Sequence, residues 1–428
     1  MTADVQQFRR GEVNGFVPPW NTGVSNAITT AINAANYAQN GVLFEPFMIK
    51  VVPGTGFYNI WNSERGSNPI TFYQYFGGAD PYRTLGDLVV FSSLPNNDQY
   101  RNYPDGAMLF APSASHPDAL AQPIGFQWIL DDYRSGNSRD IKYYRIIPPA
   151  GYSACGIAFT NGGPPDPTHY WCVKTSHLIS IGRQFVWSDD GQHWTKHTGD
   201  LWKPVFEGKN APGMPDGEML LIPQTWLSFE DRGNETAWAL RMQTAELPVT
   251  VPTPDPVFNK DTRDGTMTTY GVKSVKVMPF TTVADPGYPT AGMSSPFYYI
   301  AAEPFWYCSE VLDTREGGER TRTVTIGVSH LHSEAFAQST SITVSAEVGA
   351  AYDGVGAKVS TSFTKEWDLS TADSTEHSTQ VTTTEKVKYP QSPTTQVWEY
   401  RTQIAVYRSD SSQLVPVTYI NKTTKFLP

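Results

Sequence analysis

The stretch from residue 342 to residue 365 alternates small polar and apolar residues in two runs that meet at Asp353 and Gly354. A period of two places the two residue types on opposite faces of a strand, and Asp-Gly is a favoured two-residue turn, so the stretch predicts a β-hairpin. Pairing across this turn gathers both apolar sets on one face. That face comprises Ile342, Val344, Ala346, Val348, Ala350, Tyr352, Val355, Ala357, Val359 and Phe363. The other face carries Thr343, Ser345, Glu347, Lys358, Ser360 and Ser362.

Two environments fit such a hairpin. In a β-sandwich its apolar face would lie in the core and its polar face in water. It also fits a membrane, because a strand of about 11 residues, rising ~3.3 Å per residue and tilted by ~40°, spans roughly 28 Å, the height of a transmembrane barrel wall. The apolar face would then meet lipid and the polar face would line a lumen. Two strands alone leave unpaired edges in hydrocarbon, so several copies would have to close one barrel.

Composition narrows the class of protein. The 428 residues include 34 Gly and 33 Pro, and 17% are charged against a typical ~25%, which favours a turn-rich β protein. The net charge of -10 argues against a nucleic-acid partner, since phosphate binding needs a basic surface. The sequence contains no run of 18 apolar residues, so it predicts no transmembrane helix. The first residues lack the apolar core of a signal peptide. We expect a soluble cytosolic product that is released and acts elsewhere.

Internal repeats organise the first half of the chain. After one short amphipathic helix, expected from Val24, Ile28, Ile32 and Ala35 at helical spacing, the sequence reads as strands and turns. YPDGAMLFAP at 103–112 returns as MPDGEMLLIP at 214–223. Three segments share one pattern, in which an apolar strand end is followed by an acidic turn. After two of these segments comes a second element, and the two second elements resemble each other. These segments are IWNSERGS at 60–67, ILDDYRSGNSRD at 129–140 and VWSDDGQHW at 186–194, with YRTLGDL at 82–88 and YSACGIA at 152–158. Three copies predict three sheets with pseudo-threefold symmetry.

The stretch DDYRSGNSRDIKYYRIIPPAGYSACGIAFTNGGPPDPTHYWCVKTSHL, from 131 to 178, resembles the signature of the VPS62-related family. The resemblance rests on the DD turn, the P-P-x-G-Y strand, the P-P loop and the C-V-K strand. It implies a β-prism of three four-stranded sheets, which we place over residues 41–245, after an N-terminal segment at 1–40. The Pro-rich stretch 246–265 reads as the linker to a second domain at 266–428.

Beyond residue 320, long segments alternate Ser or Thr with apolar residues on both sides of the hairpin. This pattern resembles the pore-forming module of aerolysin-like toxins. The resemblance implies a soluble monomer that forms homo-oligomers on a target membrane and refolds its hairpin into a β-barrel. Before insertion the apolar face needs cover, for which we expect the neighbouring long strands, with Tyr352 and Phe363 as anchors.

Signals of catalysis are weak, and we expect no enzyme, cofactor or metal. His330 and His332 would share a face of a strand, but the sequence offers no third ligand at a fixed spacing. His193 and His197 have helical spacing in a strand-like segment. Cys155, Cys172 and Cys308 are too few for a disulfide framework and are expected as buried apolar residues, with a bridge between the first two left open.

The repeated acidic turns have two interpretations. Asp is favoured in turns because its side chain bonds the local backbone. Carboxylates beside aromatic rings are also suited to a glycan, the first candidate for a surface receptor. The candidate receptor-binding residues are Asp131, Asp132, Tyr133, Asp189, Asp190 and Trp194.

Taken together, these patterns predict an essentially all-β, two-domain protein. The preferred hypothesis is a pore-forming cytolytic toxin whose β-prism binds a cell-surface receptor and whose C-terminal domain inserts the hairpin. Toxins of this build suggest an insect midgut target. The alternative is a lectin-like β-prism protein whose C-terminal β domain is a scaffold that does not insert.

Overall fold

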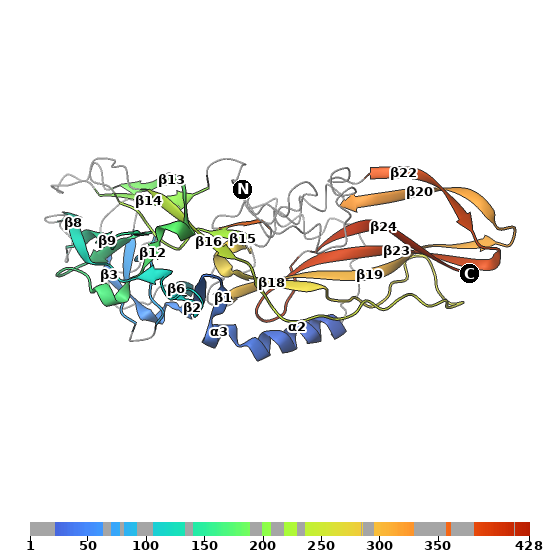
Figure 1. The fold of residues 1–428 in the computed structure, drawn as a ribbon, viewed down its shortest axis with the longest axis horizontal. Coiled ribbons are helices and arrows are strands. Elements are labelled where there is room, and N and C mark those ends of the chain that lie inside the picture. Colours follow the sequence, from blue (N-terminus) through green and yellow to red (C-terminus); the bar gives the residue numbers. More distant parts are fainter. Residues whose placement is uncertain are drawn as a thin grey trace.

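The computed structural model describes residues 22–62, 70–77, 81–91, 106–132, 140–188, 199–206, 218–228, 236–283, 285, 295–328, 357–360, 381–414 and 416–428. The protein is mainly β, as expected. Figure 1 shows an elongated molecule with two parts. We call the described residues up to 245 the head and those from 246 onward the tail, apart from strand β21, which lies beside the head.

The head contains several small antiparallel sheets. Three of them are built from β3 (Phe57–Asn62), β4 (Thr71–Tyr75) and β5 (Leu88–Val90); from β8 (Gly125–Asp131), β9 (Lys142–Ile147) and β11 (Ile157–Thr160); and from β13 (Leu178–Ser188), β14 (Asp200–Val205), β15 (Glu218–Leu221) and β16 (Ala237–Gln243), with β21 (Ala357–Ser360) at the edge. Two further sheets join β1 (Val42–Phe44), β2 (Phe47–Pro53) and β6 (Gly106–Pro112), and β7 (Leu120–Ala121), β10 (Tyr152–Ser153) and β12 (Cys172–Lys174). The resemblance implied four strands a sheet, whereas the described strands give three, three and five.

The first strand of each of the three sheets carries a β-bulge at the same place in the repeat. The register shifts between Asn59 and Trp61 in β3, between Trp128 and Leu130 in β8, and between Phe185 and Trp187 in β13. A bulge adds one residue and turns the strand. The residue after each bulge, Trp61, Leu130 or Trp187, is buried in one core shared by the three sheets. The predicted threefold repeat is therefore present in both the strands and their packing.

The second set of repeated elements meets at the centre of the head. A Cβ atom on Gly86 would lie 3.0 Å from the Cα of Gly156, and one on Gly156 would lie 2.8 Å from the Cβ of Thr225. The Thr225 hydroxyl also donates to the Cys155 carbonyl at 2.8 Å. Side chains at the two glycine positions would push these segments apart, so glycine is required there by close backbone approach.

The tail is one long antiparallel sheet in the order β17-β18-β19-β23-β24-β20-β22. Its strands are β17 (Ala245–Glu246), β18 (Ser274–Pro279), β19 (Phe297–Thr314), β20 (Gly318–Val328), β22 (Val381–Tyr389), β23 (Ser392–Tyr407) and β24 (Val417–Leu427). The central pair, β19 and β23, stays in register from Tyr299 opposite Tyr407 to Thr314 opposite Ser392, with two bulges. At ~3.3 Å per residue, β19 extends about 60 Å.

The Pro-rich stretch 246–265, expected as a linker, runs along the tail. The Leu247 amide donates to the Val275 carbonyl at 2.8 Å, Val251 bridges to Val272, and the Gly265 amide donates to the Cys308 carbonyl at 2.8 Å. Proline lacks an amide donor and is tolerated at sheet edges, which is where this stretch lies.

Head and tail share one continuous apolar core, which we call the junction core. It includes Phe47 and Leu221 from the head, Val275 and Phe297 from the tail, and Ile28 from the N-terminal helix. That helix, α2 (Thr22–Ala35), is followed by α3 (Tyr37–Asn40) and lies beside the tail in Figure 1. The amphipathic helix was predicted from its spacing, and Ile28 and Ile32 form its buried face.

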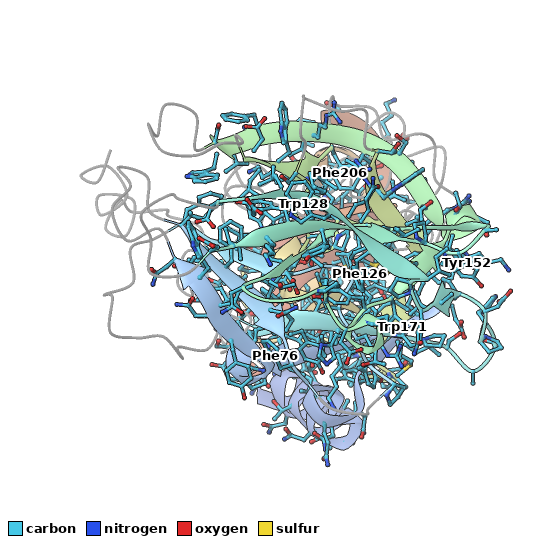
Figure 2. All side chains as sticks on the ribbon, turned by 90° about the vertical axis from the view of Figure 1, so that its left-hand side faces the viewer. Phe76, Phe126, Trp128, Tyr152, Trp171 and Phe206 are labelled. Carbon is cyan, nitrogen blue, oxygen red and sulfur yellow. The ribbon has the colours of Figure 1, made fainter. Side chains whose placement is uncertain are left out.

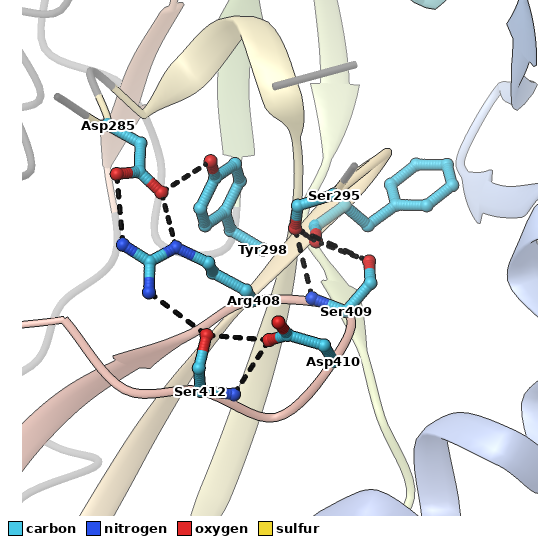
Figure 3. Close-up of polar contacts among 8 residues, drawn as sticks. Asp285, Ser295, Tyr298, Arg408, Ser409, Asp410 and Ser412 are labelled. Atoms are coloured by element: carbon cyan, nitrogen blue, oxygen red, sulfur yellow. Dashed lines mark hydrogen bonds and ion pairs between the residues drawn. The ribbon is translucent and has the colours of Figure 1, made fainter. Parts of the chain in front are cut away.

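A polar cluster fixes the turn between β23 and β24 near this helix (Figure 3). Arg408 donates from Nε and Nη2 to the buried Asp285 carboxylate at 2.6 and 3.0 Å, and the Tyr298 hydroxyl donates to the same carboxylate at 3.0 Å. Arg408 also donates to the Ser412 hydroxyl at 2.9 Å. From the same turn, Ser411 accepts a hydrogen bond from Thr29 of α2 at 2.8 Å. A buried bidentate ion pair of this kind orients the turn because both partners have fixed geometry.

Candidate functional site

The segment predicted to insert leaves and rejoins the tail at one point of the sheet. Strands β20 and β22 pair in antiparallel register from Gly318 opposite Tyr389 to Ile326 opposite Val381. The chain between them, residues 329–380, contains the whole hairpin region 342–365. We call the paired strands the ladder. A hairpin that starts from the end of a two-stranded ladder can extend it without any change in chain direction.

One face of the ladder is exposed and polar. Opposite residues share a face, so Thr321 lies with Lys386, Thr323 with Thr384, and Glu319 with Lys388. All of these side chains are exposed. The sequence pattern of alternating Thr predicted such a face, which is typical of strands with water on one side.

The other face of the ladder is held to the tail by a buried arginine. Arg322 of β20 donates to Glu399 Oε1 at 2.6 Å, to the Ser309 hydroxyl at 3.0 Å and to the Thr424 hydroxyl at 3.3 Å. These partners belong to β23, β19 and β24. Arg401 donates to the second Glu399 oxygen at 2.7 Å and lies over the Tyr307 ring. This ion-pair network was not predicted from the sequence, because its members are far apart along the chain.

Backbone pairing between the ladder and the rest of the tail is short. In the described part of the chain, β20 pairs with β24 at Gly327 opposite Ile420 and at Val328 opposite Tyr419. Val324 and Ile326 add buried apolar contacts. The described contacts between the ladder and the rest of the tail thus include two backbone pairs, the apolar side chains of Val324 and Ile326, the Arg322 network and the ring of Tyr389, whose centroid lies 5.2 Å from that of Phe426.

Four residues of the predicted hairpin are described, and they lie against the head. Strand β21 pairs antiparallel with β15, with Ala357 opposite Leu221, Val359 opposite Met219 and Ser360 opposite Glu218. The expectation that the long tail strands cover the hairpin is wrong for these four residues. The physical reason is that β15 offers an edge of backbone donors and acceptors beside buried apolar side chains, which a strand can complete.

The remaining predicted hairpin residues lie outside the described residues. On the apolar face and at the turn they are Ile342, Val344, Ala346, Val348, Ala350, Tyr352, Asp353, Gly354, Val355 and Phe363, and on the polar face they are Thr343, Ser345, Glu347 and Ser362.

The predicted receptor site is described in part. Asp131 ends β8, and the next residue, Asp132, is buried and accepts a hydrogen bond from the Ile141 amide. The Asp132 amide in turn donates to the Ile141 carbonyl at 3.1 Å. Asp132 therefore bonds the neighbouring backbone, as the first interpretation of these acidic residues expected. Tyr133, Asp189, Asp190 and Trp194 lie outside the described residues.

Exposed aromatic residues on the head were not predicted. Trp128 and Phe185 occupy equivalent positions, directly before the bulges of β8 and β13, and their side chains are 44% and 49% exposed. Trp128 lies opposite Tyr144, and Phe185 lies opposite Trp202 with ring centroids 5.3 Å apart. Figure 2 shows Trp128 on the end of the head that faces away from the tail. The signal for this pair was an aromatic residue at the same place in two repeats.

Two buried carboxyl groups have raised pKa values. Glu303 of β19 accepts hydrogen bonds from the Tyr407 hydroxyl and, at 3.0 Å, from the Gln403 amide, and burial raises its pKa to about 7. Asp87 in the head accepts from the Phe159 amide at 2.7 Å and from the Tyr170 hydroxyl at 3.0 Å. Burial raises the pKa of Asp87 to about 8. Both groups are buried in packed parts of the fold, so their titration affects stability.

The remaining candidate groups are the cysteines and the paired histidines. Cys155, Cys172 and Cys308 are free and buried, as predicted from their number. His193, His197, His330 and His332 lie outside the described residues. Within the ranges that the structure describes, no group of three or more His, Cys, Asp or Glu side chains is arranged to hold a metal ion. Nor does any helix in those ranges have the length and apolar character needed to span a membrane.

Comparison with known proteins gives distant structural similarity. Neither the models of known protein families nor the sequences of curated proteins match this chain. The crystal structure of GNIP1Aa from Chromobacterium piscinae is similar over 44% of this chain and 34% of its own, with 21% identity and a TM-score of 0.34. This chain thus spans about a third of the length of GNIP1Aa. The crystal structure of Cry35Ab1 is similar over 88% of this chain and 90% of its own, with 12% identity and a TM-score of 0.32. At these scores the similarities carry no conclusion about family or function.

Proposed function

We propose that this protein is a pore-forming toxin, in which the head attaches to a cell surface and residues 342–365 insert into the membrane as part of an oligomeric β-barrel. The observation that carries the proposal is the place of this segment in the fold. The period-two stretch lies within the chain that connects the end of β20 to the start of β22, and these two strands form a ladder with an exposed polar face. A hairpin that prolongs such a ladder has the strand direction and the two-faced character that a barrel wall requires.

The way in which the ladder is attached supports the proposal that the ladder can separate from the rest of the tail. Backbone pairing between β20 and β24 covers two residue pairs in the described chain, and the remaining described contacts of the ladder are made by side chains. Regions with few packed contacts open at a lower free-energy cost than the rest of a fold. The β19 and β23 pair, by contrast, is continuous over its length and would remain as the support from which the segment moves.

The head is the part proposed to recognise the target. Trp128 and Phe185 expose aromatic rings to solvent, and burying these rings against a partner would be favourable. A cell-surface glycan remains our first candidate for that partner, because the repeated turns of the head combine carboxylates with aromatic rings. Insect midgut cells are the first target to test, because toxins of this build suggest them.

The experiment is dye release from liposomes and from midgut cells, with a matched pair of charge insertions. Val348→Arg places a charge on the proposed lipid face and should abolish release, because Arg at the bilayer midplane costs about 2–4 kcal/mol per site, repeated in every subunit. Val344→Arg and Val359→Arg should act in the same way. The control is Ser345→Arg, which puts the same charge on the proposed lumen face and should retain release.

If Val348→Arg and Ser345→Arg release dye equally, with folding and cell binding intact, this hairpin does not insert as proposed. Binding of wild-type protein to midgut cells without any release would favour the lectin-like alternative. Ring-shaped oligomers on the same membranes, seen by electron microscopy, would support the pore directly.

A further inference from the structure

We infer that β15 is a docking edge on the head that holds the insertion segment in place until the protein reaches a membrane. This inference rests on the proposed function and adds a regulatory contact to it. Four consecutive backbone pairs carry it, with β21 of the segment lying antiparallel along β15. The segment is thus held at one end of the ladder in the tail, where it follows β20 and precedes β22, and here in the head.

The surroundings of β15 explain why its edge needs an occupant. On one face, Met219 and Leu221 are fully buried in the junction core. On the other face, Leu220 is buried against Ile222 and Ala239. The second edge of β15 is taken by β16. A strand that is apolar on both faces and open at one edge would invite pairing with other chains, so an occupied edge keeps the monomer from aggregating.

The register matches the two-faced pattern of the segment. Ala357 and Val359 come from the apolar positions of the predicted hairpin, and they lie opposite Leu221 and Met219. Lys358 and Ser360 come from the polar positions. Lys358 lies opposite the buried Leu220, and Ser360 lies opposite Glu218, whose carboxylate accepts hydrogen bonds from Arg241 at 2.7 and 3.0 Å.

Docking and insertion exclude each other. Residues 357–360 cannot lie in hydrocarbon while they complete a sheet whose other strands form the core of the head. Insertion therefore requires the four pairs to separate, and the β15 edge is exposed when they do. The contact with the head therefore restrains the insertion segment and must be broken before that segment can insert.

Cross-linking tests this directly. We would prepare Glu218→Cys with Ser360→Cys, and Met219→Cys with Val359→Cys. Consecutive antiparallel pairs alternate between about 5.5 and 4.5 Å in Cα separation, and both separations are within the range of a disulfide. The native cysteines are buried, so mild oxidation acts on the introduced pair. Single-cysteine variants are the matched controls.

We expect rapid intramolecular cross-linking in solution, at least tenfold loss of dye release in the oxidised form, and recovery on reduction. Failure of both pairs to cross-link, or full release by a verified cross-linked protein, would overturn the inference. Hydrogen exchange gives a second measurement: the amides of 219–221 should exchange faster once the wild-type protein has inserted, and unchanged protection would overturn it too. If wild-type protein releases no dye, the proposed function fails, whereas efficient cross-linking would still establish the docking edge.

Discussion

Glu303 makes the stability of the tail sheet depend on pH. Its side chain is buried on β19, and burial raises its pKa to about 7 from the ordinary 4.5. Because the folded state favours the protonated acid, the stabilising contribution is complete below pH 4.5 and is lost as the pH rises through 7. The gap of about 2.5 pH units, at about 1.4 kcal/mol per unit, corresponds to a loss of about 3 kcal/mol in the free energy of unfolding.

The substitution Glu303→Gln removes this titration and keeps the size of the side chain. The Gln oxygen can accept from the Gln403 amide, and its own amide can donate to the Tyr407 oxygen, so both present partners are retained. We expect the variant to lose none of this stability between pH 4.5 and 8. Relative to wild type it should gain about 3 kcal/mol over that range.

Hydrogen exchange of the β19 and β23 amides, corrected for the intrinsic effect of pH, measures this local free energy. The readout is specific to the tail, which matters because Asp87, with a pKa of about 8, changes stability in the same direction from within the head. Glu310→Gln, on the same strand but half-exposed, is the matched control. A wild-type tail whose stability stays level or rises from pH 5 to 8, or a Glu303→Gln variant with the wild-type slope, would refute the reasoning.

Two further predictions concern the ladder and the centre of the head. Arg322→Met should destabilise the ladder by about 3 kcal/mol, since it leaves part of a buried ion-pair network unsatisfied, and faster exchange of β20 and β22 amides would register this; Arg320→Met, exposed on the same strand, should have little effect. Gly156→Ala should lower the free energy of unfolding of the head by about 1–3 kcal/mol, because the added methyl group would crowd Thr225; thermal unfolding would measure this. Gly162→Ala should leave the free energy of unfolding unchanged, because the space around Gly162 is open.

Features set by local sequence were predicted well. The helix followed from the spacing of Ile28 and Ile32, and the three sheets of the head followed from repeats in which the same residue types return. The turn role of Asp132 was among the interpretations because Asp commonly bonds its local backbone. In each case the physical cause lies within a few residues along the chain.

Features set by distant partners were not predicted. Glu303 depends on Gln403 and Tyr407, about a hundred positions away, so nothing near it in the sequence shows that it is buried. The pairing of β21 with β15 joins segments that the sequence assigns to different domains. The Pro-rich stretch looked like a linker because proline is common in linkers, although proline also suits the edge of a sheet.

The junction core determines how the tail stands when the head is attached to a surface. Its packed side chains pass from head to tail as one cluster, so a tilt of the head is transmitted to the tail. With β19 about 60 Å long, a small rotation of the head would move the far end of the tail by many ångströms. Copies attached through the same patch of the head would therefore carry their ladders at a common height and angle, and would approach one another already aligned.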